Sequence, residues 1–126
     1  MKEQEFLKYK KWAVIGAHVR HDRYGYKIYK KLKEKGYEVY PINPRFDEIE
    51  GDKCYKDLSS IPVKIDVIDM VVNPKRGIPI IEEAAKLGIN KVWFQPGTVD
   101  DDILKLAKEK GIDIVQACVL VATNYI

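Results

Sequence analysis

The segment Trp12-Ala13-Val14-Ile15-Gly16-Ala17 decides the fold, because it places an apolar run directly before a glycine turn. A short run rich in Val and Ile that ends at glycine is typical of a buried strand. A helical pattern follows over residues 24–36, in which Ile28 and Leu32 stand four residues apart among charged neighbours. A second strand is predicted over residues 37–42. Strand, turn, helix and strand in this order predict the first half of a nucleotide-binding sheet.

Two departures from the dinucleotide-binding pattern narrow the class of ligand. The turn reads Gly16-Ala17-His18-Val19-Arg20, so the G-x-G-x-x-G fingerprint is absent. The second strand ends in Asn43-Pro44-Arg45, where an NAD-binding unit carries an acidic residue for the ribose 2′-hydroxyl. An asparagine and a cation in that place suit a ribose that bears an extra phosphate. The pattern therefore points away from NAD and toward coenzyme A or NADP.

The rest of the chain continues the alternation of strands and helices. Further strands are predicted over residues 66–72, 90–95 and 112–116, and helices over residues 3–10, 74–88 and 100–111. The long connection over residues 46–62 contains breakers and a predicted turn of helix at residues 57–60. These elements predict an α/β fold, a doubly wound Rossmann-like domain. Its five-stranded parallel sheet has the order 3-2-1-4-5 and helices on both faces.

The strand order predicts where a ligand binds. In doubly wound sheets the crevice lies where the winding reverses, here at the carboxyl ends of strands one and four. The loops that start at Gly16, Asn43, Asn73 and Gln95 are therefore expected to converge on one site. Asn73 is also the predicted N-cap of a helix, with Pro74 in its first turn.

Size and composition exclude several classes of protein. The 126 residues predict one domain over residues 1–126, and 46% apolar with 33% charged residues are typical of a globular protein. The net charge is +3 and no long basic run occurs, so no nucleic-acid partner is expected. The first residues are polar and no apolar run is long enough to span a bilayer, so no membrane partner is expected. Two cysteines without a secretory segment favour a reduced, cytoplasmic protein.

An ordered set of short segments runs through nearly the whole chain. In sequence they are Val14-Ile15-Gly16-Ala17, Arg23, Tyr26, Gly36-Tyr37-Glu38-Val39-Tyr40-Pro41-Ile42-Asn43-Pro44, Gly51-Asp52-Lys53-Cys54-Tyr55, Ser60-Ile61-Pro62, Asp66-Val67 and Val92-Trp93-Phe94-Gln95-Pro96-Gly97. In this set the chain resembles the small single-domain coenzyme A-binding proteins. Their fold is similar to the N-terminal domain of the succinyl-CoA synthetase alpha subunit. His18 stands where that family commonly has serine. Cys118 fits the family pattern, but Val119-Leu120-Val121-Ala122 replaces the polar or acidic residue that often follows.

The resemblance implies binding of coenzyme A or an acyl-CoA through its phospho-ADP moiety. The protein would then be a carrier, sensor or partner subunit without chemistry of its own. The small residues Gly16 and Ala17 let backbone N–H groups approach a pyrophosphate at a helix N-terminus. His18 lies in the same loop, Arg23 falls on a family position and can hold phosphate oxygens, and Tyr26 follows at the start of the helix.

The resemblance also implies where the rest of the ligand lies. Asn43, Pro44 and Arg45 flank the adenosine and its 3′-phosphate, Pro74 packs on the adenine, and residues 95–97 line the pantetheine path. The candidate coenzyme A-binding residues are therefore Gly16, Ala17, His18, Arg23, Tyr26, Asn43, Pro44, Arg45, Asn73, Pro74, Lys75, Gln95, Pro96 and Gly97.

No catalytic or metal-binding constellation is visible in the sequence. His18 and His21 have no Ser, Cys or carboxylate at a spacing that defines a triad, and they show no zinc spacing with the cysteines. Cys118 is expected to be a small, buried apolar residue. The alternative is that it forms a mixed disulfide with a thiol-bearing ligand.

Two other functions remain open. One is an NADP-linked or other nucleotide-dependent enzyme. The other is an interaction module in which the apolar tail over residues 119–126 forms a dimer face as a C-terminal strand, with a second copy or an unknown protein as partner.

Overall fold

A five-stranded parallel sheet forms the centre of the computed structural model, which describes residues 2–125. Its strands are β1 (Lys11–Ile15), β2 (Glu38–Ile42), β5 (Val67–Met70), β6 (Lys91–Phe94) and β7 (Asp113–Gln116). The helices are α1 (Lys2–Phe6), α2 (Tyr24–Glu34), α3 (Pro74–Lys86), α4 (Asp101–Glu109) and α5 (Val119–Ala122). The smaller elements are β3 (Glu48–Ile49), β4 (Asp52–Lys53) and the 3₁₀ turns η1 (Leu58–Ser60) and η2 (Thr123–Tyr125). The predicted α/β alternation is confirmed.

The strands follow the order β2-β1-β5-β6-β7, each parallel to its neighbours. A parallel bridge between Ile42 and Tyr55 extends the sheet beyond β2. If the bridge at Tyr55 is counted as strand three, then β1 is strand one, β2 strand two, β5 strand four and β6 strand five. In this numbering the sheet follows the predicted 3-2-1-4-5 pattern, and β7 is an additional strand at the far edge. The segment over residues 66–72, which the sequence numbers third, instead lies beside β1, where it pairs as β5. The winding therefore reverses between β1 and β5.

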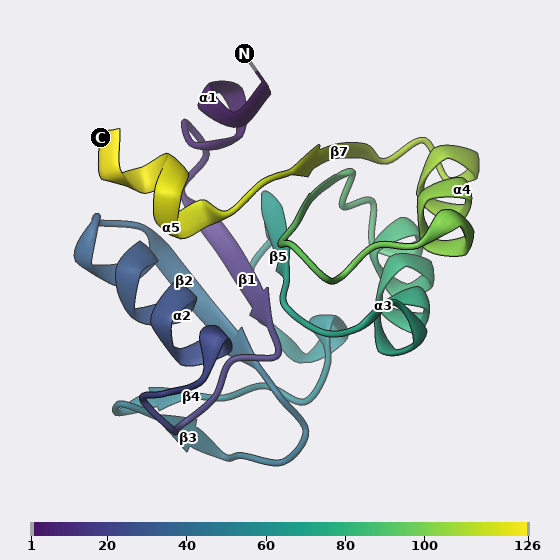
Figure 1. The fold of residues 1–126 in the computed structure, drawn as a ribbon. Helices are drawn as coiled ribbons and strands as arrows, with labels where there is room; N and C mark the ends of the chain where they lie inside the picture. Colours follow the sequence, from purple (N-terminus) through teal and green to yellow (C-terminus); the bar gives the residue numbers. More distant parts are fainter. Residues whose placement is uncertain (1, 126) are drawn as a thin grey trace.

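Helices cover both faces of the sheet, as predicted (Figure 1). The helices α1, α2 and α5 lie on one face, and α3 and α4 pack side by side on the other. Successive strand residues point to opposite faces of the sheet. Trp12 therefore belongs to the core under α1, α2 and α5, and Ala13 belongs to the core under α3 and α4. The rings of Trp12 and Trp93 lie 5.8 Å apart between centroids, and both are fully buried. The two tryptophans are therefore core residues.

Side-chain caps begin both α3, at the predicted Asn73, and α4. Asn73 Oδ1 accepts a hydrogen bond of 3.0 Å from the N–H of Arg76. Asp100 Oδ1 accepts one of 2.9 Å from the N–H of Ile103. Arg23, at the start of α2, makes no such bond. The first N–H groups of α2 therefore have no side-chain cap, although they lie at the carboxyl end of β1.

The small hairpin of β3 and β4 lies inside the long connection that the sequence leaves without strands. Its turn is Glu50-Gly51, with φ of 52° and 84°. Two consecutive residues with positive φ are typical of a tight hairpin turn. The hairpin rests on α2, because the buried Tyr29 hydroxyl donates a hydrogen bond of 3.0 Å to the carbonyl oxygen of Ile49. The predicted helical turn near residues 57–60 is confirmed as η1.

The apolar tail forms a helix rather than the strand that the interaction-module alternative requires. Val119 is fully buried, and Thr123 Oγ1 donates a hydrogen bond of 2.7 Å to its carbonyl oxygen. Only Val121 is a largely exposed apolar residue of α5, at 57%. The tail is helical because Val119 packs into the α2 side of the core. Residue 126 of the predicted dimer face lies outside the described residues. Within residues 2–125, no helix is long and apolar enough to cross a bilayer.

Candidate functional site

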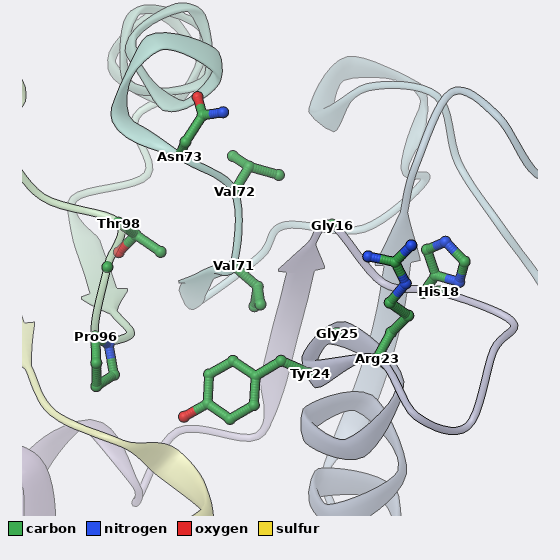
Figure 2. A pocket seen from close by; sticks show the side chains of 11 residues that line it. Gly16, His18, Arg23, Tyr24, Gly25, Val71, Val72, Asn73, Pro96 and Thr98 are labelled. Carbon is green, nitrogen blue, oxygen red and sulfur yellow. The ribbon is translucent and has the colours of Figure 1, made fainter.

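Two adjoining cavities open at the carboxyl ends of the strands. The Tyr24 cavity, of about 270 Å³, is lined by Gly16, His18, Arg23, Tyr24, Gly25, Val71, Val72, Asn73, Pro96, Gly97 and Thr98 (Figure 2). The Pro44 cavity, of about 420 Å³, is lined by Ile15, Gly16, Ile42, Asn43, Pro44, Lys56, Val72, Lys75, Arg76, Pro79 and Ile80. Gly16 and Val72 line both cavities, so the cavities meet at the end of β1. The four predicted loops thus meet across two adjoining cavities: the loop after Gln95 lines the Tyr24 cavity, and the loop at Asn43 lines the Pro44 cavity.

Two glycines bring the end of β1 and the start of α2 into direct contact. Gly16 has a φ of 93°, and a Cβ there would lie 2.9 Å from Val72 Cγ1. A Cβ on Gly25 would lie 2.0 Å from the carbonyl oxygen of Gly16. Only glycine at both positions lets the backbone pass this closely. The uncapped N-terminus of α2 is thereby held against the junction of the two cavities, where its N–H groups favour an anion.

Arg23 lines the Tyr24 cavity, and Arg45 lies near its His18 end. Within residues 2–125, the guanidinium groups of Arg23 and Arg45 make no ion pair or hydrogen bond. Burial and the charges of Arg23 and Arg45 lower the pKa of His18. His18 Nδ1 accepts a hydrogen bond of 3.0 Å from the N–H of Arg20, so a neutral His18 carries its proton on Nε2. This edge of the site thus presents the Arg23 guanidinium and an N–H donor, and the Arg45 guanidinium lies over the Phe46 ring, 5.7 Å from its centroid.

The Pro44 cavity combines apolar walls with three cations. Pro44, Pro79 and Ile80 supply the walls, and the cations are Lys56, Lys75 and Arg76. The Lys56 ammonium donates a hydrogen bond of 3.2 Å to the carbonyl oxygen of Pro44. Among the described residues, the side chains of Lys75 and Arg76 have no acidic partner. The cavity is therefore suited to a flat apolar group that carries negative charge.

Asn43 ties together the loops that follow β1 and β2. It is 5% exposed, and its Nδ2 donates a hydrogen bond of 2.9 Å to the carbonyl oxygen of Ala17. Its Oδ1 accepts one of 3.0 Å from the N–H of Arg45. Asn43 therefore holds the backbone of the site in place, while Pro44 next to it faces the cavity.

A buried chain of polar side chains lies at one end of the Tyr24 cavity. The Tyr24 hydroxyl donates a hydrogen bond of 3.2 Å to Gln95 Oε1, and it lies 2.7 Å from Cys118 Sγ. Gln95 Nε2 donates a bond of 2.6 Å to Asp69 Oδ1, and Gln95 Oε1 also accepts one of 3.0 Å from the N–H of Val119. Asp69 is fully buried, and its Oδ2 has no partner among the described residues. Burial raises the pKa of Asp69 to about 7.

The two cavities gather most of the predicted site residues. Those that line the Tyr24 cavity are Gly16, His18, Arg23, Asn73, Pro96 and Gly97. Those that line the Pro44 cavity are Gly16, Asn43, Pro44 and Lys75. The predicted residues that line neither cavity are Ala17, Tyr26, Arg45, Pro74 and Gln95. Tyr26 instead stacks on His21 at 4.2 Å between ring centroids and donates a hydrogen bond of 2.8 Å to Glu50.

Sequence reasoning missed several lining residues. They are Ile15, Tyr24, Gly25, Ile42, Lys56, Val71, Val72, Arg76, Pro79, Ile80 and Thr98. The spacing of Gly16 and Gly25, at the two ends of the turn between β1 and α2, is the signal that could have found Gly25. Tyr24 carries no such signal, because its place depends on Gln95, 71 residues away in the chain.

The groups considered for catalysis have other partners. His21 Nε2 lies 3.3 Å from Glu50, on the exposed side of the hairpin. His18 bonds to its own loop, and Cys118 contacts Tyr24. Within the described part of the chain, no group of three His, Cys, Asp or Glu side chains could hold a metal ion.

The chain matches known proteins over most of its length. Residues 10–124 match the family described as the CoA binding domain. The chain is 31% identical over 114 residues to the Uncharacterized protein YneT of Bacillus subtilis, a match that covers 90% of this chain and 84% of that protein. It is 40% identical over 89 residues to the ADP-forming acetate–CoA ligase of Methanocaldococcus jannaschii. That match covers 69% of this chain but only 12% of the ligase.

The fold is also similar to solved structures. The structure of cell-free ID.343 from Thermus thermophilus has a TM-score of 0.89 at 30% identity. The similarity covers 99% of this chain and 98% of that one. The chain thus corresponds to nearly the whole of one small protein and to a minor part of the ligase.

Proposed function

The chain belongs to the CoA-binding domain family, and from this premise we propose that it binds coenzyme A or an acyl-CoA across the two cavities. The observation that carries the proposal is the junction at Gly16, where the Tyr24 and Pro44 cavities meet beneath the uncapped start of α2. An elongated ligand with phosphates near its middle suits this arrangement.

The pyrophosphate is assigned to the junction. Backbone N–H groups at the start of α2 and the free guanidinium of Arg23 supply donors and positive charge there. Arg45 lies close enough to His18 to lower its pKa, so it adds charge to the same edge. These groups lack acidic partners within residues 2–125. They are therefore available to neutralise an anion.

The adenosine 3′-phosphate is assigned to the Pro44 cavity. Pro44, Pro79 and Ile80 offer apolar surfaces to the adenine, and Lys75 and Arg76 offer charge to the extra phosphate. The acidic residue that an NAD site places on the ribose is replaced here by the Asn43-Pro44-Arg45 turn. This combination favours coenzyme A over NAD.

We assign the protein the role of a carrier, sensor or partner subunit that performs no chemistry on the bound thioester. The contacts of three side chains support this role: His18 accepts from the N–H of Arg20, His21 pairs with Glu50 on the exposed side of the hairpin, and Cys118 contacts Tyr24. The ligase match covers only 12% of that enzyme, so most of the ligase has no counterpart among these 126 residues. Release of free thiol from acetyl-CoA by the purified protein, above the spontaneous rate, would contradict the assignment.

Calorimetric titration with coenzyme A, dephospho-coenzyme A, NADP and NAD tests the proposal. We expect coenzyme A to bind, and loss of the 3′-phosphate to weaken binding by about tenfold or more. Binding of NADP without binding of coenzyme A would overturn the proposal in favour of the nucleotide-dependent enzyme. The protein is first unfolded and extracted to remove ligand that copurifies, then refolded for the titration.

A further inference from the structure

The Tyr24 cavity changes character from one end to the other (Figure 2). Arg23 and His18 lie at one end, beside Gly16, and Pro96 and Thr98 lie at the other. The cationic end suits phosphate, so the uncharged end is left for the amide and thiol part of the same ligand. The side chain of Tyr24 extends from the start of α2 toward this uncharged end.

We infer that Tyr24 limits the size of the acyl group, so that the site takes free coenzyme A or a short acyl thioester and rejects a bulky one. Gln95 and Asp69 are positioning residues for Tyr24. This inference rests on the proposed function, because it needs the pantetheine to enter the Tyr24 cavity.

Tyr24 is held by contacts at its hydroxyl group. The hydroxyl donates to Gln95 Oε1 at 3.2 Å, which leaves its oxygen free to accept from the Cys118 thiol 2.7 Å away. A bulky group that displaces the ring would break both contacts. It would also uncover Gln95, which is only 1% exposed. Leaving buried polar groups without partners is unfavourable, so the ring resists displacement.

The orientation of Gln95 depends on Asp69. Asp69 Oδ1 accepts from Gln95 Nε2 at 2.6 Å, so the other amide atom, Oε1, faces the donors of Tyr24 and Val119. All these groups are buried or partly buried, and each bond fixes the next. Asp69 thus acts on the cavity wall through Gln95 without lining the cavity.

The test compares three ligands by calorimetry: coenzyme A, benzoyl-CoA and adenosine 3′,5′-bisphosphate. The bisphosphate lacks pantetheine and reports only on the phosphate and adenine sites. We expect the wild-type protein to bind coenzyme A at least about tenfold more tightly than benzoyl-CoA. In Tyr24→Ala the ratio should fall to about one while the affinity for the bisphosphate is unchanged. If the alanine variant does not fold, Tyr24→Leu is used, since it keeps apolar packing.

Positioning is tested with the same three ligands. Asp69→Asn keeps an oxygen acceptor for Gln95 and should retain the preference for coenzyme A. Asp69→Leu and Gln95→Ala should lose that preference without a loss of affinity for the bisphosphate. A purely structural role would instead weaken all three ligands together.

The outcomes separate this inference from the proposed function. If wild-type protein binds coenzyme A and benzoyl-CoA equally, or Tyr24→Ala keeps the preference, the inference is overturned and the proposed function stands. If neither coenzyme A nor the bisphosphate binds, both are overturned.

Discussion

A methyl group on Gly25 would lie 2.0 Å from the carbonyl oxygen of Gly16, so α2 begins against the end of β1 with no room for a side chain. Gly25→Ala should therefore lower the free energy of unfolding by roughly 2 kcal/mol or more, because the obstacle is backbone that cannot turn aside. The substitution should also lower the affinity for coenzyme A, since it displaces the N-terminus of α2 at the junction of the cavities. Urea unfolding and calorimetric titration measure the two effects.

Gly77→Ala is the matched control for that substitution. A Cβ on Gly77 would meet Ile103 Cδ1 at 2.8 Å, which is the end of a flexible side chain in a helix–helix contact. Its cost should be clearly smaller, because the side chain can shift and alanine favours the helix. Equal losses in the two variants would show that the contact between Gly25 and Gly16 is not special.

The two groups of cations should have different ligand signatures. Arg76→Ala should lower the affinity for coenzyme A by about tenfold and leave the affinity for dephospho-coenzyme A almost unchanged, because it removes a positive charge that faces only the 3′-phosphate. Arg23→Ala should weaken both ligands alike, since both carry the pyrophosphate. Lys27→Ala, on an exposed position of α2 that lines neither cavity, is the control. An Arg76→Ala variant that weakens both ligands equally would place the 3′-phosphate elsewhere.

Because of Asp69, the free energy of unfolding of the protein should fall as the pH rises. Burial raises its pKa to about 7, so the folded chain holds the proton more tightly than the unfolded chain does. From the ordinary carboxyl range up to about pH 7 the folded state therefore loses stability, by roughly 4 kcal/mol in all, and above that pH the effect is constant. Asp69→Asn carries no titrating proton and should lack this loss. Urea unfolding of both proteins between about pH 5 and pH 8 measures it.

The comparison of the two proteins removes the contributions of other groups, because these titrate alike in both. The difference in stability between Asp69→Asn and the wild type should increase with pH. Parallel pH profiles would mean that Asp69 is ionised at ordinary acidic pH despite its burial.

The main elements could be predicted because their signals are local. Buried parallel strands such as β1 and β5 are apolar runs, and the caps Asn73 and Asp100 stand directly before their helices. The hairpin could not be predicted, because strands of two residues are too short to show any period. The tail over residues 119–122 could be either strand or helix by pattern, and its packing on the α2 side of the core decides for helix.

The site could be predicted only in part for a related reason. The doubly wound pattern places strand ends together, which is enough to find Gly16, Asn43 and Pro96. It says nothing about which side chains face inward after packing. Tyr24 reaches the cavity, while Tyr26, two residues later, turns to the hairpin, and only contacts between distant segments distinguish them.

The hairpin should contribute to the stability of the protein but not to ligand binding, and Tyr29→Phe tests this. The buried Tyr29 hydroxyl donates to the Ile49 carbonyl oxygen and lies 2.5 Å from Asp52, so its removal leaves both groups with one contact fewer. We expect a loss of about 1–3 kcal/mol in the free energy of unfolding, since these groups are partly shielded from water. Affinity for coenzyme A should change by less than about twofold, because no hairpin residue lines either cavity. Tyr40→Phe is the control: its hydroxyl contacts Glu38 at the exposed surface, where such a bond contributes little. A Tyr29→Phe variant as stable as Tyr40→Phe would mean that the hairpin is not held by α2. One that loses affinity for coenzyme A would place the hairpin in the binding site.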